Sequence, residues 1–133
     1  MSKATYDVIL VGAGPTGIFA AYELMLKAPK LKVLLIDKGN DIYHRNCPIL
    51  LKKIKQCPKD MYGNSGCYPA CSITCGFGGA GAFSDGKFNI TDEFGGWMNE
   101  YLDDEEVLDL INYVDKLLYI YYTFAILISQ YLK

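Results

Sequence analysis

The sequence predicts an α/β fold that begins with a parallel βαβ unit and carries an incomplete sheet. Three observations lead to this prediction: a short β-branched apolar run at residues 6–11, a glycine-rich turn directly after it, and a second apolar run at residues 31–36. Short apolar runs bounded by turn residues are typical of buried parallel strands, apolar on both faces. We recognise no further strand downstream, so we expect the sheet to remain small.

The glycine-rich turn has the spacing G-x-G-x-x-G, formed by Gly12, Gly14 and Gly17. In this motif the first glycine allows a tight turn, the second lets the backbone approach a pyrophosphate, and the third lets the helix pack closely on the strand. Pro15 suits a first helical turn because its missing N–H costs nothing there. The helix start then offers N–H groups and a partial positive charge to phosphate. The alternative is an ordinary βα turn that happens to be glycine-rich.

The helix after this turn is expected to run from Pro15 to about Lys27, where Pro29 stops it. Asp37 ends the second apolar run, about 20 residues beyond Gly17, which is the spacing at which an acidic side chain reaches a ribose hydroxyl. Strand, glycines, helix, second strand and acidic residue therefore all follow in the required order. Together they predict an adenine-dinucleotide site in residues 1–39, which a lone glycine motif would not.

A second centre is predicted in residues 57–90, a long Gly/Cys-rich loop that follows a short helix and loop at residues 41–55. Gly76, Gly78, Gly79 and Gly81 allow its backbone to come very close to a ligand. Ser84 and the backbone N–H groups of the loop are suited to phosphate or to a flavin edge. Interleaved phenylalanines argue against the alternative of a flexible linker.

The same region holds most of the five cysteines of the chain. Three or four thiols this close in sequence, Cys57, Cys67, Cys71 and Cys75, are compatible with zinc or an iron–sulfur cluster, although their spacing matches no standard pattern. Reduced thiols in a loop are an equally good interpretation. A redox-active thiol pair is a weaker one, because no Cys-x-x-Cys is present. The N-terminus has no secretory signal pattern, so we expect reduced thiols and a cytoplasmic protein.

Residues 103–132 are predicted to form a C-terminal helix, because an acidic start is followed by apolar residues at helical spacing. From residue 117 onward the pattern is apolar all round, yet shorter than the roughly 20 residues that span a bilayer. A buried helix, a membrane-seeking tail and the scrambled end of a truncated reading frame are the alternatives, and we favour the last. Such a tail allows self-association, whereas the net charge of −2 suggests no nucleic-acid partner.

Beyond these single motifs, residues 6–116 resemble a known group of proteins. The segments GAGPTGIFAAYEL, LLIDKG, RNCP, CGFGGAGAFSDGKFN and EFGGW, in this order, look like the N-terminus of the uncharacterised bacterial and archaeal FAD-dependent dehydrogenases, within the two-dinucleotide-binding-domain flavoproteins. The resemblance implies a Rossmann-type FAD/NAD(P)-binding unit and an oxidoreductase whose bound flavin carries electrons or hydride. Members are several times longer, so residues 1–133 are expected to be a single, incomplete FAD-binding domain. An NAD-dependent dehydrogenase fragment and a non-catalytic or inert fragment are the alternatives.

The resemblance also implies cofactor contacts. It places the first glycine motif at the FAD pyrophosphate, the acidic residue at the adenosine ribose, Arg45 near the adenine or pyrophosphate, and residues 78–84 near the rest of FAD. The candidate cofactor-binding residues are Gly12, Gly14, Pro15, Thr16, Gly17, Asp37, Lys38, Arg45, Gly78, Gly79, Gly81 and Ser84. No catalytic residue can be named, because the polar candidates Asp85, Lys87 and Tyr101 have no evident pairing.

Overall fold

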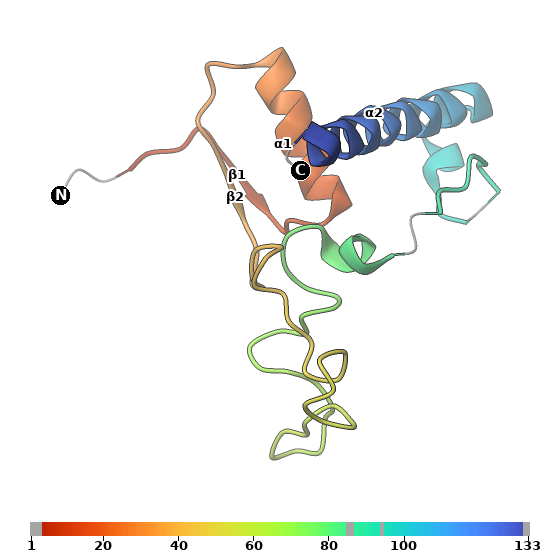
Figure 1. Ribbon diagram of the computed structural model, residues 1–133. Helices are drawn as coiled ribbons and strands as arrows, with labels where there is room; N and C mark the ends of the chain where they lie inside the picture. The colour runs from red at the N-terminus through yellow and green to blue at the C-terminus, as the bar shows by residue number, and fades with distance from the viewer. Residues whose placement is uncertain (1–3, 85–86, 94, 132–133) are drawn as a thin grey trace. The chain divides into compact units, whose positions relative to one another are not determined.

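The computed structural model describes residues 4–84, 87–93 and 95–131, with side chains up to residue 119 (Figure 1). In chain order its elements are β1 (Val8–Val11), α1 (Pro15–Lys27), β2 (Val33–Ile36), the 3₁₀ helices η1 (Gly79–Phe83) and η2 (Met98–Glu100), and α2 (Asp104–Tyr131). The chain divides into two compact units, Met1–Gly86 and Lys87–Lys133. Each is described by itself below.

The first unit contains the predicted βαβ arrangement. β1 and β2 pair in parallel, with Val8 opposite Val33 and Val11 opposite Ile36, and α1 packs against both strands. α1 has the predicted bounds, because Pro15 fits its first turn and Pro29 follows its end. Both strands are shorter than the apolar runs that predicted them. The described residues of this unit therefore form a small α/β fold with a two-stranded parallel sheet.

The prediction that β1 is buried on both faces is wrong. Its burial alternates along the strand, and Ile9 and Val11 are 57% and 82% exposed. Burial of both faces of a parallel sheet requires covering elements on each side. Because α1 covers one face, every second residue of β1 remains accessible. Among the described residues of this unit, few side chains are buried: Ala13, Cys47 and Arg45.

Residues 41–55 form successive turns instead of the expected short helix. Lys52 has a φ of 56°, in the left-handed region, which a continuous right-handed helix does not permit. The N–H groups of Leu51 and Lys53 donate to the carbonyl groups of Cys47 and Pro48, and each closes a single turn. This segment leads into the long loop that carries η1.

The second unit contains η2 and α2, and its helix starts where the acidic cluster predicted. The N–H of Glu106 donates to Asp103 Oδ1 at 2.9 Å, and the N–H of Asp103 donates to Glu106 Oε2 at 3.1 Å. This reciprocal pair is a capping box, which satisfies two donors at the start of α2. Val107, in the first turn, is buried.

The end of α2 covers most of the predicted apolar tail, residues 117–132. The helix continues to Tyr131, but the side chains from residue 120 onward lie outside the described residues, and so does most of the apolar segment 117–132. No helix in the described part of the chain is long and apolar enough to cross a membrane.

Candidate functional site

The turn between β1 and α1 places its three glycines in different environments. Gly12 has a φ of +103°, a conformation that residues with a side chain rarely adopt. A Cβ on Gly17 would overlap the carbonyl oxygen of Gly12 and lie 3.3 Å from Leu35 Cδ1, whereas a Cβ on Gly14 would meet nothing within 4 Å. Gly12 therefore shapes the turn, Gly17 brings the helix against the turn and β2, and Gly14 leaves open space at the start of α1.

An open cleft of about 390 Å³ lies on this turn, lined by Leu10, Val11, Gly12, Gly14, Pro15, Thr16, Gly17 and Ala20. Gly14 is the N-cap residue of α1, and as a glycine it has no side chain that could cap the first N–H groups of the helix. The first N–H groups of an α-helix have no partner within the helix, and they carry partial positive charge. A helix start beside open space is suited to an anion such as a pyrophosphate.

Asp37, directly after β2, is tied to this turn by its carboxylate. The N–H of Ala13 donates to Oδ2 and the N–H of Gly39 donates to Oδ1, both at 2.8 Å. These bonds, that of Gly39 first, lower the pKa of Asp37, with smaller contributions from the Gly76 N–H and the Lys38 charge. Asp37 is exposed, and a carboxylate has about four acceptor positions. It can therefore keep both backbone bonds and still accept a hydroxyl donor from a ligand.

The second glycine motif packs directly on the first. The N–H of Gly78 donates to the carbonyl of Ala13 at 2.8 Å. A Cβ on Gly79 would lie 3.1 Å from Gly14 Cα and 3.3 Å from Pro15 Cδ, so a side chain there would press on the start of α1. Two motifs that lie far apart in the sequence thus meet at one helix start, as Figure 1 shows for η1 and α1.

The other predicted cofactor-binding residues take little or no part in the contact between the second glycine motif and the start of α1. A Cβ on Gly81 would be 4.0 Å from Pro15 Cγ. Ser84 is exposed at the end of η1, where its N–H donates to the Gly81 carbonyl. Lys38 and Thr16 are also exposed. Asp85, one of the polar candidates, lies outside the described residues.

Arg45 is buried and bonded within the glycine loop. It is only 4% exposed, and its Nε, Nη1 and Nη2 donate to the carbonyls of Ser72, Phe77 and Ile73 at 2.9, 2.7 and 2.6 Å. Its guanidinium carbon also lies 4.8 Å from the centre of the Phe83 ring. A buried guanidinium needs partners for its donors, and loop carbonyls supply them. Arg45 therefore anchors the glycine loop through three of its five N–H donors.

A close backbone contact at Gly39 and Gly76 was missed by sequence reasoning. A Cβ on Gly39 would lie 2.5 Å from the backbone nitrogen of Gly76, and a Cβ on Gly76 would overlap the carbonyl oxygen of Asn40. The N–H of Phe77 donates to that same carbonyl at 3.1 Å. The available signal was the glycine that stands two residues after Asp37.

The metal-site interpretation of Cys57, Cys67, Cys71 and Cys75 is corrected by the structure. Within the described residues no group of three or more His, Cys, Asp or Glu side chains is placed to hold a metal ion. Cys57, Cys67 and Cys71 line one pocket, and Cys75 is not among its lining residues. All five cysteines are in the thiol form.

Comparisons with known proteins give short, partial similarities. A stretch of 47 residues, 35% of this chain, is 45% identical to an uncharacterized protein of Methanosarcina barkeri, of which it covers 12%. A stretch of 41 residues, 31% of this chain, is 42% identical to the mitochondrial L-2-hydroxyglutarate dehydrogenase of Dictyostelium discoideum, of which it covers 9%. The chain thus spans about a tenth of the length of these curated relatives. No family model and no solved structure matches the sequence.

Proposed function

We propose that this chain is the FAD-binding N-terminal portion of an FAD-dependent oxidoreductase of the dehydrogenase type, built on a Rossmann-type βαβ unit. The observation that carries the proposal is the meeting of two glycine motifs at the start of α1, beside an open cleft. The short similarity to a dehydrogenase supports the oxidoreductase class.

The residues at the cleft fit a dinucleotide. The empty space at Gly14 is a cradle that a Cβ would begin to fill, and the N–H groups of Thr16 and Gly17 belong to the uncapped helix start. Asp37 stands at the end of the neighbouring strand, with acceptor positions left for a ribose hydroxyl. FAD, when bound, supplies electron or hydride transfer, and the chain supplies binding and orientation.

FAD is favoured over NAD(P) because of the glycine loop. A first βαβ unit with its G-x-G-x-x-G turn serves either cofactor equally well. Residues 76–83, however, are anchored by Arg45 and press their backbone onto Ala13, Gly14 and Pro15. A simple NAD-dependent dehydrogenase fragment has no use for this second loop, whereas a longer cofactor that extends past the helix start does.

The test is a titration of the purified chain with FAD, NAD⁺ and NADP⁺, followed by isothermal calorimetry and, for FAD, by quenching of flavin fluorescence. We expect FAD to bind most tightly, and Gly14→Val to weaken it at least about tenfold, which is ~1.4 kcal/mol. Gly66→Val is the matched control, because a Cβ on Gly66 also meets nothing, yet Gly66 is not among the residues that line the cleft. Tighter binding of NAD⁺, or equal FAD affinities for the two variants, would contradict the proposal.

A further inference from the structure

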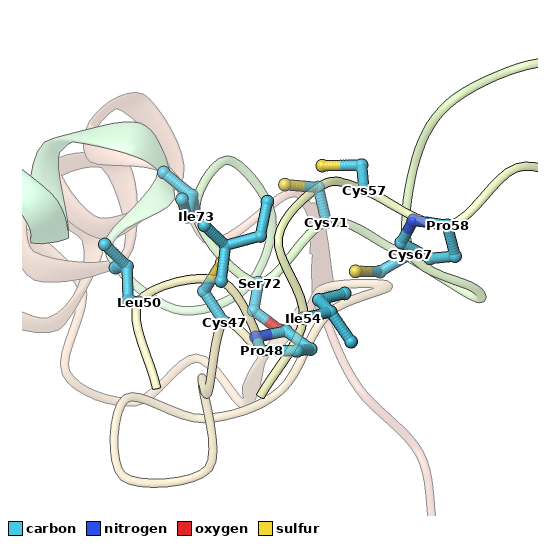
Figure 2. A pocket seen from close by; sticks show the side chains of 11 residues that line it. Cys47, Pro48, Leu50, Ile54, Cys57, Pro58, Cys67, Cys71, Ser72 and Ile73 are labelled. Carbon is cyan, nitrogen blue, oxygen red and sulfur yellow. The ribbon is translucent and has the colours of Figure 1, made fainter. Parts of the chain in front are cut away.

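A second, smaller cavity lies in the loop region of the first unit, away from the glycine turn. It has a volume of about 90 Å³, and its walls come from two stretches of chain, residues 47–58 and 67–73. Figure 2 shows the cysteine side chains Cys47, Cys57, Cys67 and Cys71 gathered around it among prolines and isoleucines. Cys47 is buried, Cys67 and Cys71 are half-buried, and Cys57 is exposed. An apolar pocket with partly exposed thiols in its wall can bring a small apolar molecule next to a nucleophilic sulfur.

Among these thiols, Cys71 is the one whose surroundings stabilise the thiolate. The backbone N–H of Thr74, the N–H of Ile73 and the Thr74 hydroxyl lower the pKa of Cys71, and the Arg45 guanidinium contributes in the same direction. Arg45 is held in place because it donates to the carbonyls of Ser72 and Ile73, the two residues that follow Cys71. The positive charge beside the thiol is therefore part of the fold.

Cys67 has the opposite character. Its burial first, and then the thiols of Cys57, Cys71 and Cys47, raise the pKa of Cys67. These effects show that Cys67 lies within electrostatic reach of the other three pocket thiols. Part of this repulsion disappears when Cys71 becomes a neutral disulfide, because the thiolate charge is then gone. Reaction of Cys71 therefore favours ionisation of Cys67, which the resolving step requires.

We propose that this pocket is a thiol–disulfide exchange site for small apolar disulfides, with Cys71 as the attacking thiol and Cys67 as the resolving thiol. The Cys71 thiolate attacks one sulfur of RS–SR, a Cys71–S–SR bond forms, and RS⁻ leaves. Cys67 loses its proton to water and attacks the Cys71 sulfur, the Cys67–Cys71 bond forms, and a second RS⁻ leaves. The two cysteines are oxidised by two electrons, the small disulfide is reduced, and the two released thiolates take up the two protons.

This exchange does not depend on a dinucleotide, and it needs no Cys-x-x-Cys motif, because the fold supplies the proximity. Reactivity should depend on whether a thiol lines the pocket. Cys75 is half-buried like Cys71 and comes from the same loop, yet it does not line the pocket. It therefore serves as the matched control for reactivity.

The experiment follows the reduced full chain after mixing with dithiodipyridine, a neutral aromatic disulfide whose leaving thiol absorbs light. We expect a fast phase that releases two leaving thiols per chain, lost in Cys71→Ser and retained in Cys75→Ser. In Cys67→Ser the fast phase should release one leaving thiol and leave a mixed disulfide on Cys71, detected by mass spectrometry. Cys71 should react faster than Cys75, because Cys71 lines the pocket that receives the disulfide and its surroundings favour the thiolate.

A measurement on the unaltered chain keeps the test independent of variant folding. Substoichiometric iodoacetamide, followed by peptide mapping, should label Cys71 before Cys57 and Cys75, because the surroundings of Cys71 favour the thiolate. First labelling of Cys57 or Cys75 would overturn the assignment of the attacking thiol. A mapped Cys57–Cys71 bond in the oxidised chain would overturn the assignment of Cys67.

Discussion

Replacement of Gly17 by alanine tests whether α1 touches the glycine turn as closely as the structure shows. In an ordinary helix interior this change stabilises a protein by about 1 kcal/mol, since alanine loses less backbone entropy than glycine. Here the new methyl group would overlap the carbonyl oxygen of Gly12 and lie 3.3 Å from Leu35 Cδ1. The leucine can rotate away, but the carbonyl belongs to the backbone of the turn. The helix or the turn must therefore move.

The expected cost follows from these two terms. Overpacking of a close contact typically costs ~1–3 kcal/mol, and an obstacle in the backbone belongs at the upper end of that range. After subtraction of the helix-propensity gain, Gly17→Ala should lower the free energy of unfolding by about 1–2 kcal/mol. In a domain of this size each kcal/mol corresponds to roughly 4–8 °C in Tm. The effect is therefore large enough to measure.

The assay is urea unfolding followed by far-UV circular dichroism, with Gly14→Ala as the control. A methyl group on Gly14 meets nothing within 4 Å, and Gly14 has a φ of −75°, which alanine adopts without strain. This variant should cost less than Gly17→Ala, because it creates no clash and loses only the preference of N-cap positions for glycine over alanine. If Gly17→Ala is instead as stable as the unaltered chain, or more stable, then the helix does not contact the turn and the argument for the cleft is refuted.

Three further substitutions address the contacts that surround the cleft and the start of α2. Asp37→Asn should lower the free energy of unfolding at pH 7 by no more than about 1 kcal/mol, because the exposed carboxylate is screened by solvent. Because the pKa of Asp37 is lowered, its contribution to the free energy of unfolding is present above the ordinary value of 3.8 and is lost as pH falls below it. Unfolding curves at pH 7 and pH 3 should therefore show a smaller difference between Asp37→Asn and the unaltered chain at pH 3. A difference that is the same at both pH values would contradict this. Arg45→Lys should lower the free energy of unfolding by about 2 kcal/mol, because a lysine cannot reproduce the planar set of donors that binds the three carbonyls. It should also speed limited proteolysis of residues 57–84. If proteolysis is unchanged, Arg45 does not anchor the loop. Asp103→Ala should cost about 1 kcal/mol and reduce helicity, whereas Asp103→Asn, which can still cap, should change both less.

The parts of the fold that sequence reasoning predicted correctly depend on local rules. Pro15 and Pro29 delimit α1 because proline acts on its own helix turn. The acidic start at residues 103–106 marks α2 because a capping box spans only four residues. The pairing of the two strands follows from the short βαβ connection, which leaves a parallel arrangement as the simplest solution.

The parts that were mispredicted depend on contacts between distant segments. The apolar side chains of Ile9 and Val11 predict a second element packed on that face of the sheet. Only the three-dimensional structure shows that these side chains are exposed. Likewise, the sequence alone does not reveal that Arg45 anchors the loop, because its carbonyl partners Ser72, Ile73 and Phe77 lie about 30 residues away. The closeness of the cysteines in the sequence made a metal site one interpretation, whereas the described residues contain no group of three or more side chains placed to hold a metal ion.

Ala13 connects the two halves of the candidate site, although no ligand-based motif assigns it a role. Its N–H donates to Asp37 and its carbonyl accepts from Gly78, while its side chain is 3% exposed. The acidic residue and the second glycine loop are thus both fastened to the same peptide of the turn. Binding costs less when the contacting groups are already ordered, because the entropy of positioning them has been lost on folding. The backbone of the turn therefore fastens Asp37 and the second glycine loop to Ala13, which lies just before the start of α1.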